Sequence, residues 1–145
     1  MWCLFLNCLI MIPENTKNTN FFKFEGLRIY HKSVDFTNAI LSLSNSVQTT
    51  AQKIVIDQFL TEAGQISANI IDGASHSKAE FIEYLQKAKS NIGKCVMICT
   101  LAAKQSLIDE TQEEDIRNEL MELTKMIGAL ILSFQKHDSA NNSEI

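Results

Sequence analysis

Residues 67–99 read SANIIDGASHSKAEFIEYLQKAKSNIGKCVMIC, and this stretch predicts the end of one helix, a tight break and the start of the longest helix. Gly73 lacks a Cβ, so it can adopt the left-handed conformation that commonly closes a helix. Ser77 and Glu80 have the S-x-x-E spacing of a capping box, in which each side chain bonds the backbone amide of the other residue. An apolar run begins directly after this box. A helix end and a helix start this close together predict an antiparallel helical hairpin.

Apolar residues recur at helical spacing on both sides of this hairpin. The pattern predicts helices over residues 26–47, 52–72, 78–105 and 110–136, the last of them capped by Asp109. In chain order, the predicted core stripes are Leu27, Tyr30, Val34, Ala39 or Leu41 and Val47; Ile56, Phe59, Leu60, Ala63, Ile66, Ile70 and Ala74; Phe81, Leu85, Ala88, Ile92, Cys95, Cys99 and Ala102; and Ile116, Leu120, Leu123, Ile127, Leu130 and Phe134.

These four stripes, joined by short loops, predict an all-α fold in the form of an antiparallel up-down-up-down four-helix bundle over residues 24–137. No window alternates apolar and polar residues as a sheet would require. The end of the first helix is rich in Ser, Thr and Asn, so we expect it to fray. The polar residues 138–145 predict a disordered tail.

The composition fits one soluble globular domain of 145 residues with 46% hydrophobic and 21% charged residues. A single proline and five glycines favour long helices over a turn-rich β fold. The net charge of −4 gives no general attraction to nucleic acid or to an anionic membrane. The four cysteines, Cys3, Cys8, Cys95 and Cys99, are too few for a secreted disulfide scaffold, so we expect reduced thiols in a cytoplasmic protein.

The N-terminal residues 1–23 form an apolar and then polar extension. Residues 1–12 lack the basic flank of a signal peptide and are too short to span a bilayer as a helix. Three interpretations remain open: an over-called start with Met11 as the initiator, an apolar arm that docks on the bundle, and a membrane or export signal. Residues 13–20 are polar and predict a loop or a disordered segment.

Three short motifs resemble those of a bacterial four-helix-bundle family first noticed in intervening sequences of large-subunit ribosomal RNA genes. Residues 27–33, LRIYHKS, stand where members have a pattern like L-x-V-W-x-K-A. Residues 68–73, ANIIDG, resemble S-N-I-A-E-G at the end of the second helix. The pattern S-x-x-E-F-x-x-F-L-x-x-A is matched by Ser77, Glu80, Phe81, Tyr84, Leu85 and Ala88.

The resemblance extends over roughly residues 24–136, and the family is similar to the accessory proteins of diversity-generating retroelements. It implies a ring-shaped homo-oligomer, often a pentamer, with no established enzymatic activity, and basic members are expected to bind nucleic acid. This chain departs from the pattern at several positions. Leu60 and Thr61 replace a basic pair, His76 stands nearest to the usual position of an arginine, and Lys94 replaces an acidic residue.

No motif for catalysis, cofactor binding or metal binding is present, so we predict no catalytic, cofactor or metal residues. None of the three histidines follows a glutamate at the spacing of a di-metal bundle. Cys95 and Cys99 with His76 could form a metal site, but core packing is the favoured interpretation. Glu80 and Glu83 could act as paired carboxylates, but a capping Glu80 and a solvated Glu83 are favoured.

Asn69 and Asp72 lie at the end of the second predicted helix, where a negative charge is unfavourable. We favour hydrogen bonds from these side chains to the following turn. Contact with a ligand and contact with another subunit are the alternatives.

Charge is unevenly distributed between the last two predicted helices. Residues 78–104 hold five lysines and two glutamates, whereas residues 109–122 hold seven acids and one arginine. Two solvated helix faces would explain this pattern. The alternative is that unlike surfaces meet between subunits of a ring. The candidate partner surface consists of Lys78, Lys87, Lys89, Lys94, Asp109 and Glu113.

Apolar residues outside the main stripes also favour assembly, because such residues usually have a second surface to bury. They are Ile71, Ile82, Val96, Ile98, Met121, Met126 and Ile131. We therefore predict a non-enzymatic, homo-oligomeric interaction or scaffold protein with an unknown protein partner and no membrane or cofactor. The alternative is a nucleic-acid-binding accessory factor, associated with a ribosomal RNA intervening sequence or with a reverse transcriptase.

Overall fold

Four α-helices and two short 3₁₀ helices make up residues 21–142, the part of the chain that the computed structural model describes. The elements are η1 (Lys23–Gly26), α2 (Arg28–Ser42), η2 (Leu43–Ser46), α3 (Thr50–Ala74), α4 (Lys78–Lys104) and α5 (Glu110–Asn142). The described residues contain no strand, which confirms the all-α prediction. The predictions for residues 1–20 and for the last three residues fall outside the described part.

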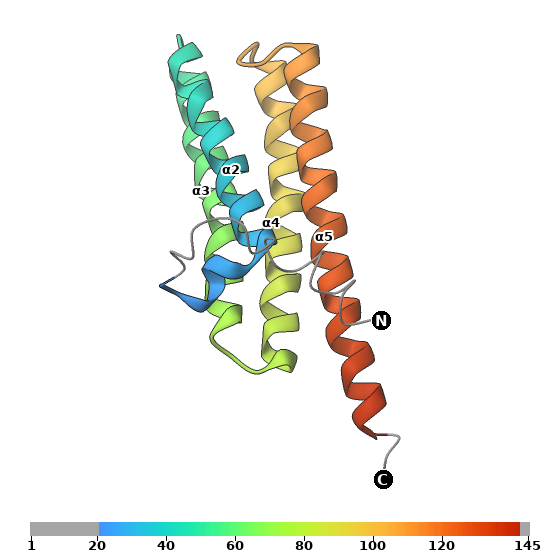
Figure 1. Ribbon diagram of the computed structural model, residues 1–145. Coiled ribbons are helices and arrows are strands. Elements are labelled where there is room, and N and C mark those ends of the chain that lie inside the picture. Colours follow the sequence, from blue (N-terminus) through green and yellow to red (C-terminus); the bar gives the residue numbers. More distant parts are fainter. Residues whose placement is uncertain (1–20, 143–145) are drawn as a thin grey trace, which may run out of the picture.

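The helices run alternately up and down, and each packs on its neighbours in the cyclic order α2, α3, α4, α5 (Figure 1). The α3–α4 pair makes the most extensive contact and the α2–α5 pair the least. With 15 residues, α2 is about 22 Å long, whereas α4 with 27 residues is about 40 Å long. The lower part of α5 extends past the α3–α4 turn (Figure 1).

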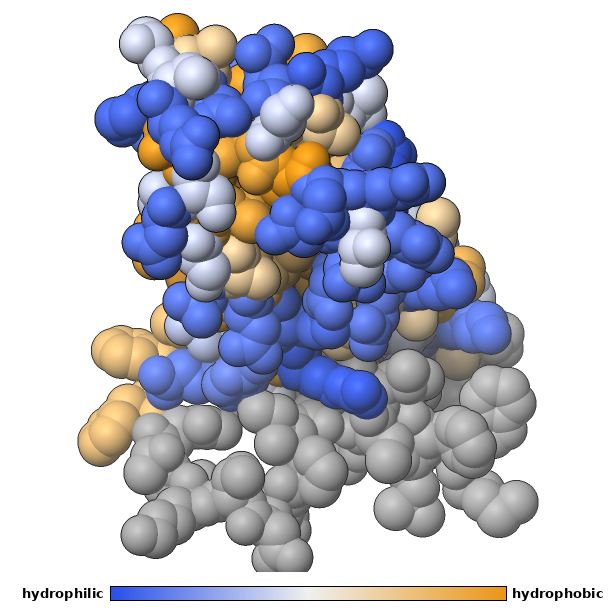
Figure 2. Space-filling view, turned by 90° about the horizontal axis from the view of Figure 1, so that it is seen from above, coloured by the Kyte–Doolittle hydropathy of each residue, from blue (hydrophilic) through white to orange (hydrophobic). Residues whose placement is uncertain are grey.

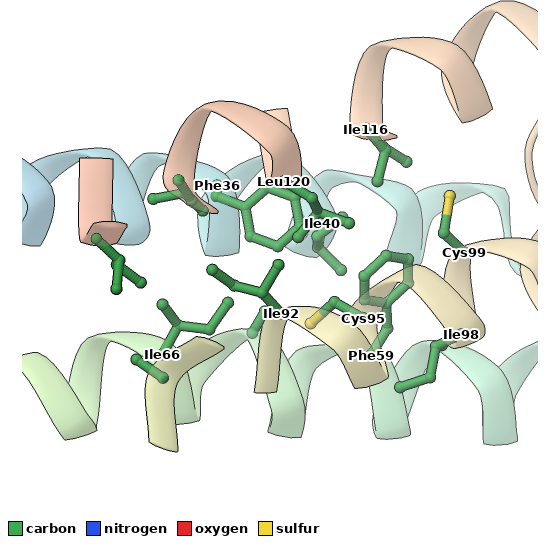
Figure 3. Close-up of a cluster of buried hydrophobic side chains, with 14 of the residues drawn as sticks. Phe36, Ile40, Phe59, Ile66, Ile92, Cys95, Ile98, Cys99, Ile116 and Leu120 are labelled. Atoms are coloured by element: carbon green, nitrogen blue, oxygen red, sulfur yellow. The ribbon is translucent and has the colours of Figure 1, made fainter. Parts of the chain in front are cut away.

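The core lies along the bundle axis and is shared by all four helices (Figure 3). The predicted stripes of α3, α4 and α5 are confirmed, because their members are buried or pack partly buried against the core. The stripe predicted for the first helix is confirmed only in part. Leu27, Tyr30 and Val47 pack against the core, but Val34 is 40% exposed and Leu41 is 53% exposed. The buried residues of this segment are instead Ile29, Ser33, Phe36, Ile40 and Leu43.

A polar residue in the middle of the true α2 stripe explains this error. Ser33 is fully buried, and its hydroxyl donates to the Tyr30 carbonyl at 2.7 Å. The same hydroxyl shares a 2.8 Å hydrogen bond with Ser67 of α3. Because both oxygens are satisfied, the serine can occupy a core position that a hydropathy pattern assigns to the surface. As expected, the regular helix ends early, and 3₁₀ geometry follows over Leu43–Ser46.

The α3–α4 hairpin confirms the capping box and corrects the role of Gly73. The Ser77 hydroxyl accepts from the Glu80 amide at 3.3 Å, and Glu80 Oε2 accepts from the Ser77 amide at 3.1 Å. No glycine among the described residues has a positive φ, so Gly73 does not adopt the left-handed conformation. Instead, a Cβ at Gly73 would overlap the Phe81 ring and lie 2.8 Å from the Cβ of Tyr84. Glycine is needed here for the close approach of two helices.

Replacing Ser77 with alanine should lower the free energy of unfolding by about 1 kcal/mol, because one amide in the first turn of α4 loses its acceptor. Urea denaturation followed by circular dichroism measures this loss. Ser77→Thr keeps a hydroxyl acceptor and serves as the control. Equal midpoints for the alanine variant and the parent protein would show that the cap does not stabilise α4.

The α4–α5 turn closes with a Schellman motif that uses a serine where glycine is usual. The Leu107 amide donates to the Ala102 carbonyl and the Ser106 amide to the Ala103 carbonyl, each at 3.0 Å. Ser106 has a φ of 56°, the one positive value among the described non-glycine residues. Asp109 is confirmed as the cap of α5, because its Oδ1 accepts from the Gln112 amide at 2.8 Å.

Replacing Ser106 with glycine should raise the free energy of unfolding by about 0.5–1 kcal/mol, because glycine adopts positive φ without a Cβ clash. Thermal melts of the two proteins measure the difference. Gln105→Gly is the matched control, since Gln105 has a φ of −88° and gains nothing from glycine there. Stabilisation by both substitutions, or by neither, would contradict this explanation.

The end of α5 differs from the prediction. The helix continues beyond Lys136 to Asn142, so residues 138–142 are helical where a disordered tail was predicted. Ser139 contributes by donating its hydroxyl to the Gln135 carbonyl at 3.2 Å. A polar helix end is compatible with this, because water satisfies an exposed helix terminus.

Candidate partner surfaces

The structure places Lys87 and Lys94 on the side of α4 that faces α3. Lys94 Nζ lies 3.6 Å from Glu62 Oε2 of α3, in an ion pair within the chain. Lys87 Nζ lies 4.4 Å from the centre of the Tyr84 ring, in a cation–π contact. Both lysines are exposed, but each already has an interaction inside its own bundle.

Lys78 and Lys89 lie on the other flank of α4. Eleven residues make about three turns of an α-helix. Lys78, Lys89 and Thr100 are spaced by eleven residues each, so they lie along one stripe of α4. Arg117 of α5 donates to the Thr100 hydroxyl at 2.7 Å, which identifies this flank as the one facing α5.

The two acids of the candidate surface also have roles within the chain. Asp109 caps α5, and Glu113 forms a 3.0 Å ion pair with Arg117. They lie at the start of α5, whereas Lys78 begins α4 at the opposite end of the bundle (Figure 1). The six predicted residues therefore do not form one continuous patch on a single chain.

A polar network between α3 and α4 was not predicted from the sequence. The Asn69 amide donates to Asn91 Oδ1 at 2.9 Å, and the Asn91 amide donates to Glu62 Oε2 at 2.7 Å. Asn91 is only 8% exposed, so these bonds satisfy groups that water reaches poorly. The sequence signal for this network is three polar residues, Glu62, Asn69 and Asn91, next to the apolar stripes of the two helices.

The favoured prediction for Asn69 is therefore wrong, because its side chain bonds α4 and not the turn. At Asp72 it is the backbone that contacts the turn. The Asp72 carbonyl accepts from Ser75 Oγ at 2.8 Å and lies 2.6 Å from His76 Nδ1. These side-chain contacts add to the hydrogen bond that the Ser75 amide donates to the same carbonyl at 3.4 Å, at the end of α3.

Cys95 and Cys99 pack in the core, each with no exposed surface (Figure 3). Burial raises the pKa of the Cys95 thiol to about 12 and also raises the pKa of Cys99, so both remain protonated at neutral pH. No cluster of three His, Cys, Asp or Glu side chains suited to a metal occurs among the described residues.

Glu80 serves as a cap, as predicted. Its hydrogen bonds with the Ser77 hydroxyl and amide lower the pKa of its carboxyl group, because they favour the charged form. Glu83 is exposed on the next turn of α4.

A groove of about 370 Å³ opens between the upper halves of α2 and α5. It is lined by Phe36, Ala39, Asp115, Ile116, Asn118 and Glu119. Viewed from this end of the bundle, apolar surface is visible between hydrophilic side chains (Figure 2).

Lys32 bridges α2 and α5 beside the groove. Its Nζ lies 2.8 Å from Glu119 Oε2 and 3.0 Å from Glu122 Oε2. The hydrogen bond with Glu119 is the main cause that raises the pKa of Lys32, so the ammonium group is charged at neutral pH.

Comparison with known proteins matches residues 25–129 to the family model described as 23S rRNA-intervening sequence protein. The chain belongs to this family. The match confirms the resemblance seen in the helix-end motifs. No curated protein matches the chain.

Among solved structures, a similar protein is described as a protein with unknown function from the S23 ribosomal protein family of Bacteroides thetaiotaomicron. It is 26% identical, with a TM-score of 0.64, and the alignment covers 71% of this chain and 94% of that one. The fold described here is thus similar to that of this solved structure. Within residues 21–142, no helix is both long and apolar enough to span a membrane.

Proposed function

We propose that this chain is a non-enzymatic, cytoplasmic interaction protein that works as a closed homo-oligomer of four-helix bundles. The observation that carries the proposal is a set of exposed apolar side chains on α4 and α5, here together called the α4–α5 face. Its exposed side chains include Met97 (48% exposed), Met121 (55%) and Leu132 (56%). Such a surface on a soluble chain favours contact with another protein.

In the α4–α5 face, a glycine precedes each of two exposed apolar side chains by about one helical turn. Gly93 lies four residues before Met97, and Gly128 lies four residues before Leu132. A Cβ at either glycine would have no neighbour within 4 Å, so the glycines are not needed for packing inside the bundle. Glycine inside a helix costs about 1 kcal/mol relative to alanine. Close approach of a helix from another subunit would explain why glycine stands at these positions despite this loss of stability.

The other apolar residues predicted to favour assembly have mixed positions. Ile98 is fully buried, while Val96, Met126 and Ile131 pack against the core. The support therefore rests on the side chains that remain exposed. Burial of the exposed half of each such side chain would contribute about 1 kcal/mol toward assembly.

Light scattering after size exclusion, at micromolar concentration and moderate salt, tests the proposal. We expect a discrete multiple of the single-chain mass. A Met121→Lys/Leu132→Lys variant should shift toward a single chain, because burying unpaired lysines is unfavourable. The control is Ile54→Lys, which changes a 63% exposed apolar residue on α3. A single-chain mass for the parent protein at every concentration would refute the assembly.

The same samples can test the candidate charged contact. Reversal of Lys89, for which no ion pair occurs among the described residues, should weaken an assembly in which unlike surfaces meet. Reversal of Lys94 is less informative because it also breaks the pair with Glu62. Nucleic-acid binding is the less favoured function, since 17 acids outnumber 13 bases, and a salt-dependent gel shift would support it.

A further inference from the structure

We propose that the α2–α5 groove binds a cationic amphipathic helix of a partner protein. The inference deepens the proposed function, on which it rests for the role in protein interaction, by giving the chemistry of the partner. It does not depend on homo-oligomer formation, because the groove and the α4–α5 face lie on different flanks of α5. Glu119 lines the groove and pairs with Lys32 of α2, whereas Met121, two residues further on, points to a different side of α5.

The groove has an apolar floor. Phe36 and Ile116 form the inner part of its lining and are 2% and 8% exposed, and Ala39 adds a small, exposed side chain. The cavity of about 370 Å³ is at the lower end of the range for ligand pockets. It is open along the surface between two antiparallel helices. A shallow apolar channel of this kind suits the side chains of a docked helix.

The edges of the groove are acidic. Asp35 of α2 is exposed, and Asp115, Glu119 and Glu122 follow along α5. Lys32 bridges Glu119 and Glu122, but neither Asp35 nor Asp115 has an ion-pair partner within residues 21–142. Asp115 and Glu119 thus belong to the lining of the groove. Asp35 lies one turn from the lining residue Ala39, and Glu122 lies one turn from Glu119.

The apolar floor and the acidic edges of the groove together favour a partner with cationic side chains on an apolar helix face. Lysine and arginine can lay their aliphatic stems on an apolar surface while their charged ends reach carboxylates at the edge. Opposite charges also speed encounter and disfavour acidic partners. A phosphate backbone would meet like charges here, so a nucleic acid is a poor occupant.

A synthetic leucine–lysine peptide with leucines at helical spacing is a suitable probe. Fluorescence anisotropy at moderate salt should show saturable binding to the full chain. The same peptide with glutamate in place of lysine, and poly(U) RNA, should bind at least about tenfold more weakly. Equal or tighter binding of either comparison probe would overturn the proposal.

Matched variants locate the site. Asp35→Asn/Asp115→Asn removes two exposed charges at the groove without changing side-chain size, and should weaken peptide binding about tenfold. Asp57→Asn/Glu83→Gln removes the same charge from exposed positions on α3 and α4, and should change binding less than about twofold. If both double variants weaken peptide binding equally, the peptide is attracted by the overall negative charge and does not bind at the groove.

Two further measurements separate this proposal from the assembly. Amide resonances of Phe36, Ala39 and Ile116 should shift when the peptide is added, and shifts confined to other elements would place the peptide elsewhere. If the Asp35→Asn/Asp115→Asn variant has a different oligomeric mass from the parent protein, the groove is occupied by a second copy of the chain and the proposal is wrong. A Met121→Lys/Leu132→Lys monomer that still binds the peptide would leave the groove site intact.

Discussion

Replacing Phe59 with alanine should lower the free energy of unfolding by about 3–5 kcal/mol, the usual range for a buried aromatic ring. Phe59 has no exposed surface, and its ring centre lies 6.3 Å from that of Phe36 on α2. It projects from α3 into the region where the helices meet (Figure 3). The substitution therefore removes buried apolar contacts and leaves a cavity that rigid helices fill only in part.

Urea denaturation followed by circular dichroism measures this loss. Ile54→Ala is the control on the same helix, because Ile54 is 63% exposed and its truncation should change stability by less than about 0.5 kcal/mol. A loss of less than about 1 kcal/mol for Phe59→Ala would contradict the central position of this ring in the core.

Replacing Gly73 with alanine should lower the free energy of unfolding by about 1–3 kcal/mol, although alanine is the better helix former. The added methyl group would overlap Phe81 and press on the Cβ of Tyr84. The Phe81 ring is itself held against Phe134 of α5, at 5.3 Å between ring centres. Relief of the clash would therefore disturb the contact between α4 and α5 as well.

Gly64→Ala is the matched control for this prediction. Gly64 lies in the middle of α3, away from the proposed α4–α5 face, and a Cβ there has no neighbour within 4 Å. Alanine should therefore stabilise this position by about 0.5–1 kcal/mol through helix propensity alone. Opposite signs in thermal melts of the two variants would confirm the close α3–α4 contact, and two stabilised variants would refute it.

Local chemistry made most of the fold predictable. The capping box at Ser77, the cap at Asp109 and the apolar stripes of α3, α4 and α5 all depend on residues within a few positions of each other. Gly73 was correctly singled out, but its conformation was predicted wrongly. The backbone angle of a glycine near a helix end depends on the packing of the next helix, which a local pattern does not contain.

The candidate surface was less predictable, because it depends on how each helix is rotated about its axis. Counting charges along α4 grouped Lys78 and Lys89 with Lys87 and Lys94, yet the two pairs lie on different flanks. The groove between α2 and α5 escaped prediction for a related reason. Its floor uses Phe36, and the stripe expected for the first helix did not include that residue.

The polar contacts of α3 have a consequence for the handedness of the bundle. Four antiparallel helices can follow one another clockwise or anticlockwise around the axis, and apolar stripes alone suit both orders. In α3, Ser67 on one flank meets Ser33 of α2, while Asn69 and Glu62 on the other flank meet Asn91 of α4. The opposite order would exchange these neighbours and leave buried polar groups without their partners, at about 1–3 kcal/mol for each group. The apolar residues thus make a bundle possible, and a few buried polar side chains determine the direction in which it turns.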